Sequence, residues 1–305
     1  MPLDPCNKRA GFATLRMLLV ASATIGAAAS AGHAQGATDL FLVHLRETGG
    51  RLMADTVVRM TNRDGYDNQP FILPDGHALL YTSIDASGQA DIFRFDLASM
   101  RATNVTRTAP ESEYSATLIP SGDRFSVIRV EADSTQRLWS FRLDGSDARV
   151  VLERLKPIGY QAWIDADRVA VFLLGSPATL QVADVRDGSA RVVATDIGRS
   201  LNRVPGRAAV SFVQREDGAP GWITIFDPGT GTATPLIRAM RGNEYHVWTP
   251  AGSLLSAEGS VLYQWRPGSA EGWVRIADLA PAGVSGISRL AMSADGTRLA
   301  IVAAH

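Results

Sequence analysis

The stretch Phe71-Ile72-Leu73-Pro74-Asp75-Gly76, followed by Ala78-Leu79-Leu80-Tyr81, is the part of this sequence that decides the fold. Two short runs of apolar and aromatic residues flank Pro-Asp-Gly, a combination typical of a tight turn between strands. The segment therefore predicts two antiparallel strands joined by a turn, a unit that we call the anchor.

The anchor recurs along the chain. The six turns begin at positions 74, 120, 165, 205, 250 and 294, and the copy at 163–167 is the most degenerate. The intervals of 46, 45, 40, 45 and 44 residues suit the four-stranded blade of a β-propeller. Six such units would fill nearly the whole chain after its N-terminal segment.

Each interval also contains a third and a fourth strand. Apolar and polar residues alternate in the expected third strands, which is the strand signal, at 91–96, 137–141, 180–185, 222–226 and 261–265. Short fourth strands follow, as at Arg191–Ala194. Four strands per repeat are therefore predicted.

The two ends of the chain complement each other. Only two strands follow the sixth turn before His305, while Asp39–Leu45 resembles a third strand and Val57–Met60 a fourth. Joining them in one blade would remove exposed sheet edges, which invite aggregation. We predict an all-β, six-bladed propeller over residues 38–305, with the ring closed by the N-terminal strands that complete the last blade.

The N-terminus has the features of an export signal. Lys8, Arg9 and Arg16 form a basic flank, an apolar stretch follows from Met17, and Ala29-Ser30-Ala31 fits the cleavage pattern. The alternative is a membrane anchor, but the stretch is shorter than the roughly 20 residues that span a bilayer. We predict a signal peptide over 1–31 and a periplasmic or secreted protein with no membrane span after cleavage.

Charge and cysteine content exclude several classes. The formal net charge is −1, from 30 basic and 31 acidic residues without a basic stripe, which disfavours nucleic-acid binding. Cys6 is the single cysteine and precedes the apolar stretch, so the mature chain would have no disulfide. We expect a monomer that relies on its apolar core.

The anchors resemble the WD40-like propeller repeats of the TolB family, most specifically at Pro74-Asp75-Gly76 with Asp91–Asp96, and again at Ser293–Gly296. The resemblance implies a bacterial envelope propeller whose partner is a protein or peptide. One departure is clear, since only a few residues separate the signal from the first strand, and the α/β domain that precedes the TolB propeller is expected to be absent. A repeat of this kind is more informative about fold than about function.

Motifs for catalysis are lacking in the sequence. Gly283-Val284-Ser285-Gly286 is one residue short of a nucleophile elbow, and the histidines have no zinc-ligand spacing. The six tryptophans lie on or beside predicted strands, which favours packing between blades over sugar stacking.

Residues just before each turn enter the innermost strand and would line the central channel. The candidate ligand-binding residues at its mouth are Asp67, Asn68, Gln69, Glu113, Tyr114, Tyr160, Arg199, Ser200, Glu244, Tyr245, His246 and Arg289, with Ser115, Gln161 and Ser288 beside them. Acids, amides, tyrosines and arginines on one opening suit a polar peptide or a charged small molecule. Channel side chains can also be polar simply because they face water.

We therefore expect a non-catalytic binding platform for an envelope protein or peptide, without a cofactor. The alternative is a Ca²⁺-dependent lactonase or hydrolase that uses the same channel, with oxygen ligands from Asp67, Asn68, Glu113, Asn202 and Glu244. Against it, Arg199, Arg203 and Arg289 would oppose a cation. A structural subunit that uses its blade edges is a third hypothesis.

Overall fold

The computed structural model describes residues 36–305, and the structural statements below concern that range. The predicted signal peptide at 1–31, with Cys6, lies outside the described residues. Strands follow the predicted anchors throughout. The anchor glycines Gly76, Gly122 and Gly296 have φ of 69°, 87° and 73°, a region in which glycine is favoured because it lacks a Cβ.

The strands form four-stranded antiparallel groups, as predicted for propeller blades. Blade 1 consists of β3 (Tyr66–Ile72), β4 (Ala78–Ile84), β5 (Ala90–Asp96) and β6 (Arg101–Asn104). Blade 2 consists of β7 (Ser112–Leu118), β8 (Arg124–Val130), β9 (Gln136–Arg142) and β10 (Arg149–Leu152). Blade 3 consists of β11 (Ile158–Trp163), β12 (Arg168–Leu173), β13 (Thr179–Asp184) and β14 (Ala190–Thr195).

The remaining blades have the same order. Blade 4 consists of β15 (Ile197–Arg203), β16 (Val210–Glu216), β17 (Ala219–Asp227) and β18 (Thr232–Arg238). Blade 5 consists of β19 (His246–Trp248), β20 (Leu254–Glu258), β21 (Val261–Trp265) and β22 (Val274–Asp278), followed by the 3₁₀ turn η1 (Ala280–Ala282). Blade 6 consists of β23 (Leu290–Met292), β24 (Arg298–Ala304), β1 (Thr38–Thr48) and β2 (Arg51–Arg59).

Blade 6 combines strands from both ends of the described chain. β24 pairs with β23 on one side and with β1 on the other, where Leu40 lies opposite Val302 and Phe41 opposite Ile301. β1 then pairs with β2. One parallel pair, Thr38 with Tyr66, links this blade to blade 1 in a single eight-stranded sheet. The predicted completion of the last blade by the N-terminal strands is confirmed.

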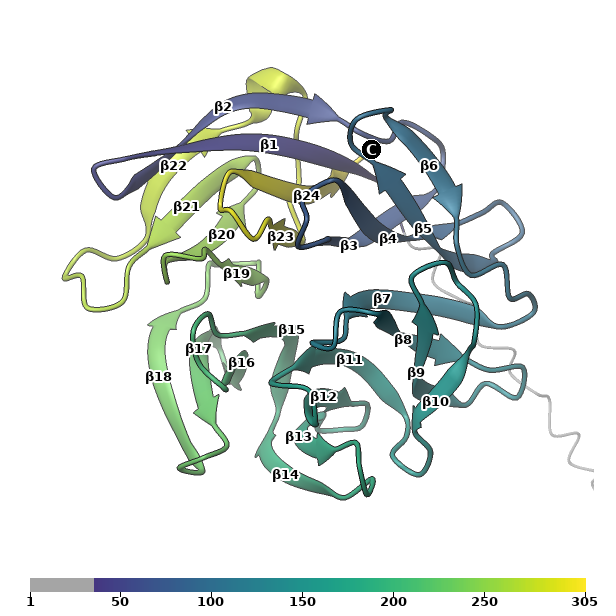
Figure 1. Ribbon diagram of the computed structural model, residues 1–305. Coiled ribbons are helices and arrows are strands. Elements are labelled where there is room, and N and C mark those ends of the chain that lie inside the picture. The colour runs from purple at the N-terminus through teal and green to yellow at the C-terminus, as the bar shows by residue number, and fades with distance from the viewer. Residues whose placement is uncertain (1–35) are drawn as a thin grey trace, which may run out of the picture. The chain divides into compact units, whose positions relative to one another are not determined.

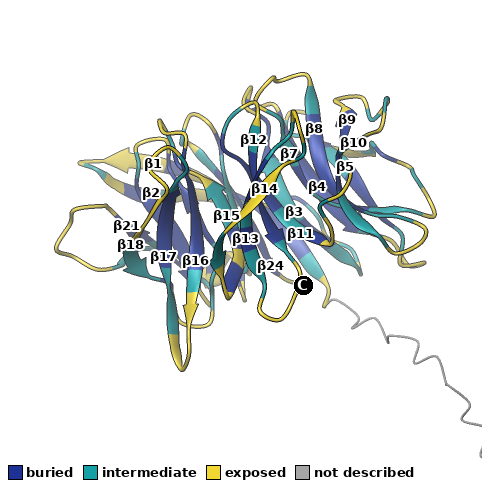
Figure 2. Ribbon diagram, turned by 90° about the horizontal axis from the view of Figure 1, so that it is seen from below, coloured by how far each residue is buried: buried dark blue, intermediate teal, exposed yellow. Residues whose placement is uncertain are grey.

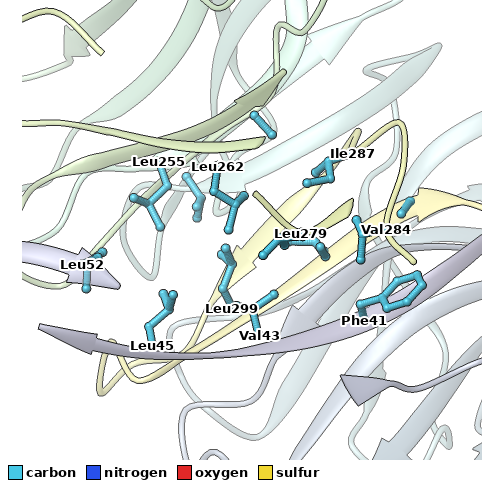
Figure 3. Close-up of a cluster of buried hydrophobic side chains, with 14 residues drawn as sticks. Phe41, Val43, Leu45, Leu52, Leu255, Leu262, Leu279, Val284, Ile287 and Leu299 are labelled. Carbon is cyan, nitrogen blue, oxygen red and sulfur yellow. The ribbon is translucent and has the colours of Figure 1, made fainter. Parts of the chain in front are cut away.

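The core lies between blades. Six clusters of buried side chains each join two neighbouring blades, and one of them joins blade 6 to blade 1. Alternate residues of β1 serve two clusters: Leu40 and Leu42 face blade 1, while Phe41 and Val43 face blade 5 (Figure 3). Successive side chains of a strand point to opposite faces, so one strand can serve two neighbours. Burial is accordingly deepest along the middle of the strands (Figure 2).

The first strand of each blade lies innermost (Figure 1). These inner strands contact one another in the order β3, β7, β11, β15, β19 and β23, and β23 also contacts β3. They bring six anchors to one central channel, which is where the sequence predicts a binding site. Among residues 36–305, no helix is long and apolar enough to cross a membrane.

Candidate functional site

Six residues, each on an inner strand or directly before one, line a common cavity. Each is the fifth residue before a turn, and we call these six residues the channel ring: Gln69, Ser115, Tyr160, Ser200, Tyr245 and Arg289. The cavity has a volume of about 470 Å³ and extends from the channel ring toward the anchor turns at Pro74 and Pro120. Its size is within the range of roughly 300–1,000 Å³ of small-ligand sites.

Arg289 reaches across the channel. It leaves blade 6, and its Nη2 donates a hydrogen bond of 3.3 Å to the hydroxyl of Tyr160 on blade 3, three blades away. The guanidinium carbon lies 4.4 Å from the ring centroid of Tyr245 and 5.1 Å from that of Tyr160. Such cation–π contacts hold the guanidinium near the middle of the channel without neutralising it.

Two tyrosines near Arg289, Tyr66 and Tyr245, are uncharged. Burial raises the pKa of Tyr66 and of Tyr245 above the ordinary phenol value, although the positive charge of Arg289 acts in the opposite direction. Phenols in this state donate and accept hydrogen bonds but bring no negative charge. The guanidinium therefore keeps its full charge in the channel.

The wall of the cavity is basic and partly apolar. Arg199, Arg203 and Arg289 line it, and none of the lining residues is Asp or Glu. Apolar side chains complete the wall, among them Phe71, Ile72, Leu118, Ile119, Leu201 and Met292. The cavity therefore suits a ligand that carries both a negative charge and apolar groups.

Three of the predicted acidic ligands are paired with arginine outside the cavity lining. Oδ1 of Asp67 lies 2.6 Å from Nη2 of Arg63, and the Asp67 carboxylate also accepts from Ser83. Oε2 of Glu244 lies 3.1 Å from Nη2 of Arg215. Glu244 lies in a second hollow, which also includes Arg199 and Tyr245.

Glu113 is fully buried between strands. Thr108 donates to its carboxylate at 2.6 Å, and Nε of Arg129 lies 3.4 Å from Oε1. Burial raises the pKa of Glu113 to about 7, because desolvation outweighs the hydrogen bond from Thr108 and the attraction of Arg129. The group titrates near neutral pH, but it does not face the channel cavity.

A β-bulge explains why neighbouring predicted residues point in different directions. The pairing register shifts between Asn68 and Phe71 and between Tyr114 and Thr117, and Gln69 and Ser115 both have φ of 56°. A bulge redirects side chains locally. Gln69 and Ser115 consequently line the cavity.

Asn68 and Tyr114 lie away from the cavity lining. The Asn68 side chain is buried, and its Oδ1 accepts from the backbone N–H of Gln69 at 2.7 Å. Tyr114 packs against the core cluster between blades 2 and 3. Of the twelve predicted residues, the cavity brings together Gln69, Tyr160, Arg199, Ser200, Tyr245, His246 and Arg289.

His246 belongs to a clamp between blades 4 and 5. Its Nε2 shares a hydrogen bond of 2.8 Å with Oγ of Ser211. The same Oγ accepts a hydrogen bond of 2.9 Å from the indole N–H of Trp248. Oγ of Ser200 lies 3.2 Å from Nδ1. Burial lowers the pKa of His246 to about 4, so the ring is neutral at physiological pH and adds no charge to the cavity wall.

An equivalent clamp joins blades 2 and 3. Ser126 Oγ accepts a hydrogen bond of 2.8 Å from the indole N–H of Trp163 and donates one of 2.6 Å to Oε1 of Gln161. Gln161 in turn donates to the backbone carbonyl of Ser115 in the channel ring. Both clamps share one sequence pattern, in which a Tyr is followed by Gln or His, then by any residue, and then by Trp. These hydrogen bonds hold channel residues in place.

We expect the two substitutions Trp163→Phe and Ser126→Ala to be strongly coupled. Each removes one partner of the same hydrogen bond, and each should cost about 1–2 kcal/mol of unfolding free energy. A double-mutant cycle from urea unfolding should give a coupling energy of about 1 kcal/mol. Trp163→Phe combined with Ser211→Ala, in the other clamp, is the additive control. Additivity within one clamp would show that the hydrogen bond contributes nothing.

The oxygen ligands considered for Ca²⁺ are not gathered at one place. Only Asn202 of that set lines the cavity, and its Nδ2 donates to the backbone carbonyl of His246 at 2.8 Å. In the described part of the chain, no three His, Cys, Asp or Glu side chains form a group that could hold a metal ion. The cavity thus does not bring together the five residues named for the calcium alternative.

Fold and site together define a β-propeller of four-stranded blades with an arginine-lined cavity in its channel. No family model matches the sequence, and neither does any curated protein. Solved structures do resemble it. A protein assigned as TolB from Agrobacterium tumefaciens has a TM-score of 0.67 at 12% identity, over 89% of this chain and 99% of that one.

Two other solved structures are also similar to this chain. TolB from Acinetobacter baumannii has a TM-score of 0.57 at 14% identity, over 88% of this chain and 64% of that one. An oligogalacturonate lyase in complex with manganese has a TM-score of 0.53 at 17% identity, over 83% and 82%. At such identities the likeness concerns the fold, so the predicted TolB-like propeller is confirmed as an architecture.

Proposed function

We propose that this chain is an exported, non-catalytic binding protein that holds a peptide segment of an envelope protein in its channel cavity. The observation that carries the proposal is the cavity itself, which side chains from all six inner strands line. A concave site with an apolar wall and few convergent polar groups is the usual form of a ligand site.

The cavity is preorganised for binding. Its lining lies on strands rather than on long loops, and the Trp163 and Trp248 clamps fix the inner strands of blades 3 and 5. Side chains that are already ordered lose little conformational entropy when a ligand binds. A rigid, partly apolar cavity therefore favours recognition of a segment that inserts its side chains.

The contacts of the carboxylates argue against the hydrolase alternative. A cation in the cavity would face Arg199, Arg203 and Arg289, while Asp67, Glu113 and Glu244 are engaged by other arginines. Repulsion of like charges opposes a divalent ion at such a place. Binding rather than metal-assisted hydrolysis is the function that this geometry supports best.

Blocking the cavity should abolish peptide binding. In a Cys6→Ser background, Thr117→Cys adds one reactive thiol at the cavity wall, and Val192→Cys adds one on β14 at a side chain that is 55% exposed. Peptides are first selected from a random dodecapeptide display library on the unlabelled protein. A bulky maleimide at position 117 should weaken binding of the selected peptides about tenfold or more.

The same label at position 192 is the control and should leave binding unchanged. Equal binding with either label would place the interaction elsewhere on the molecule and refute the proposal. The proposal would also be contradicted if the library yielded no peptide whose displayed form is displaced by the same peptide free in solution.

A further inference from the structure

Resting on the proposed function, we infer that the occupant of the channel cavity presents a carboxylate to Arg289, so that the peptides recognised are acidic. The carboxylate comes from an Asp or Glu side chain or from the C-terminal residue of the segment. Arg289 and the tyrosines of the channel form the receiving site, and the apolar wall receives the neighbouring side chains.

Arg289 lies across the channel. Its guanidinium spans the channel from blade 6 to the Tyr160 hydroxyl of blade 3 and lies over the ring of Tyr245. Any segment that fills the cavity down to the channel ring must meet this group. The contact is therefore central to the site and not at its rim.

Within residues 36–305, Arg289 has no acidic partner. Of the five N–H groups of a guanidinium, one donates to a protein acceptor, Tyr160, within residues 36–305. Other arginines that lie partly or fully inside the protein, such as Arg63 and Arg129, are paired with carboxylates. Partial burial of an unpaired charge is unfavourable, and a ligand carboxylate would compensate for it with bidentate hydrogen bonds.

The wall around Arg289 is also positively charged. Arg199 and Arg203 add to the positive potential of the cavity, and its lining contains no Asp or Glu. A cleft lined by one sign of charge concentrates ligands of the opposite sign. Tyr245, a neutral phenol that lines the cavity next to Arg289, can donate a further hydrogen bond to an anion.

The apolar part of the wall favours a peptide over an acidic oligosaccharide. Phe71, Ile72, Leu118 and Met292 line the space next to the basic residues. Aliphatic side chains of a peptide bury favourably against such a wall, whereas sugar hydroxyls would lose their hydration without replacement. A peptide segment with an acidic residue and apolar neighbours can contact both the arginines and the apolar wall of the cavity.

The test uses two pools of random nonapeptides that differ only at the central residue, which is Glu in one pool and Gln in the other. The full chain should retain the Glu pool about tenfold more than the Gln pool, since loss of one partner of a charge pair commonly has at least that effect. Arg289→Met should remove this preference, and Arg289→Lys should keep part of it.

Arg101→Met is the matched control, because Arg101 is exposed on the outer strand β6 and is not among the cavity residues. It should leave the preference intact. Raising the salt concentration from about 0.15 M to 1 M should reduce the preference of the unsubstituted chain, because salt screens exposed charges. This titration tests the inference even if Arg289→Met does not fold.

The remaining outcomes separate the two proposals. If both pools bound equally and lost binding when position 117 is blocked, the carboxylate inference would be refuted. The proposed peptide-binding function would then stand. Binding of neither pool would refute both. If trigalacturonate bound through Arg289 while neither pool did, the site would recognise an acidic sugar, and the peptide assignment would be wrong.

Discussion

A chain that ends at Arg298 is expected to lose its cooperative unfolding transition. The removed residues, 299–305, include all of β24 except its first residue, and this strand lies between β23 and β1 in blade 6. Leu299, Ile301 and Val302 of this strand are fully buried. Its removal exposes two sheet edges and opens the core clusters that blade 6 shares with blades 5 and 1.

The loss should exceed the stability of a typical domain, about 5–15 kcal/mol. Near-UV circular dichroism and thermal unfolding of the truncated chain should show no native transition. Removal of His305 alone is the control, because β24 ends at Ala304 and only the contacts of one terminal residue are lost, those with Ala37, Asp39, Arg59 and Asp64. A truncated chain with an unchanged midpoint would mean that the pairing of β1 with β24 does not hold the fold together.

Two buried groups should give opposite pH dependences of stability in the same range. The pKa of Glu113 is raised from 4.5 to about 7, so its folded state binds a proton more tightly than the unfolded state does. Its stabilising contribution is complete below pH 4.5 and is lost as pH rises through 7. The pKa of His246 is lowered from 6.5 to about 4, so its contribution is complete above pH 6.5 and is lost as pH falls toward 4.

Between pH 7.5 and 5 each contribution amounts to about 2 kcal/mol, and the two nearly cancel. Glu113→Gln should therefore leave a chain whose unfolding free energy in urea falls on acidification. His246→Gln should leave one whose unfolding free energy rises. Glutamine is a matched replacement for His246, because Gln161 has the equivalent place in the other clamp. The same slope in both variants would contradict the burial of one of these groups.

Much of the fold could be predicted from local sequence. The turn at Pro74-Asp75-Gly76 and its copies marked the strand boundaries, because tight turns require particular residues. The alternating pattern of Asp91–Asp96 identified β5, and the strand-like segment at Asp39–Leu45 identified the partner of β24. The spacing from turn to channel was also regular, so each position five residues before a turn lines the cavity.

What the sequence by itself determined was which residues enter the inner strands, and only the tertiary structure decided which of them face the cavity. Asp67, Asn68 and Gln69 are consecutive, yet Gln69 alone lines it. Side chains alternate across a strand, so one bulge exchanges inward and outward positions. Arg289 and Tyr160 are 129 positions apart in the chain, and they come into contact only when the blades assemble around one channel.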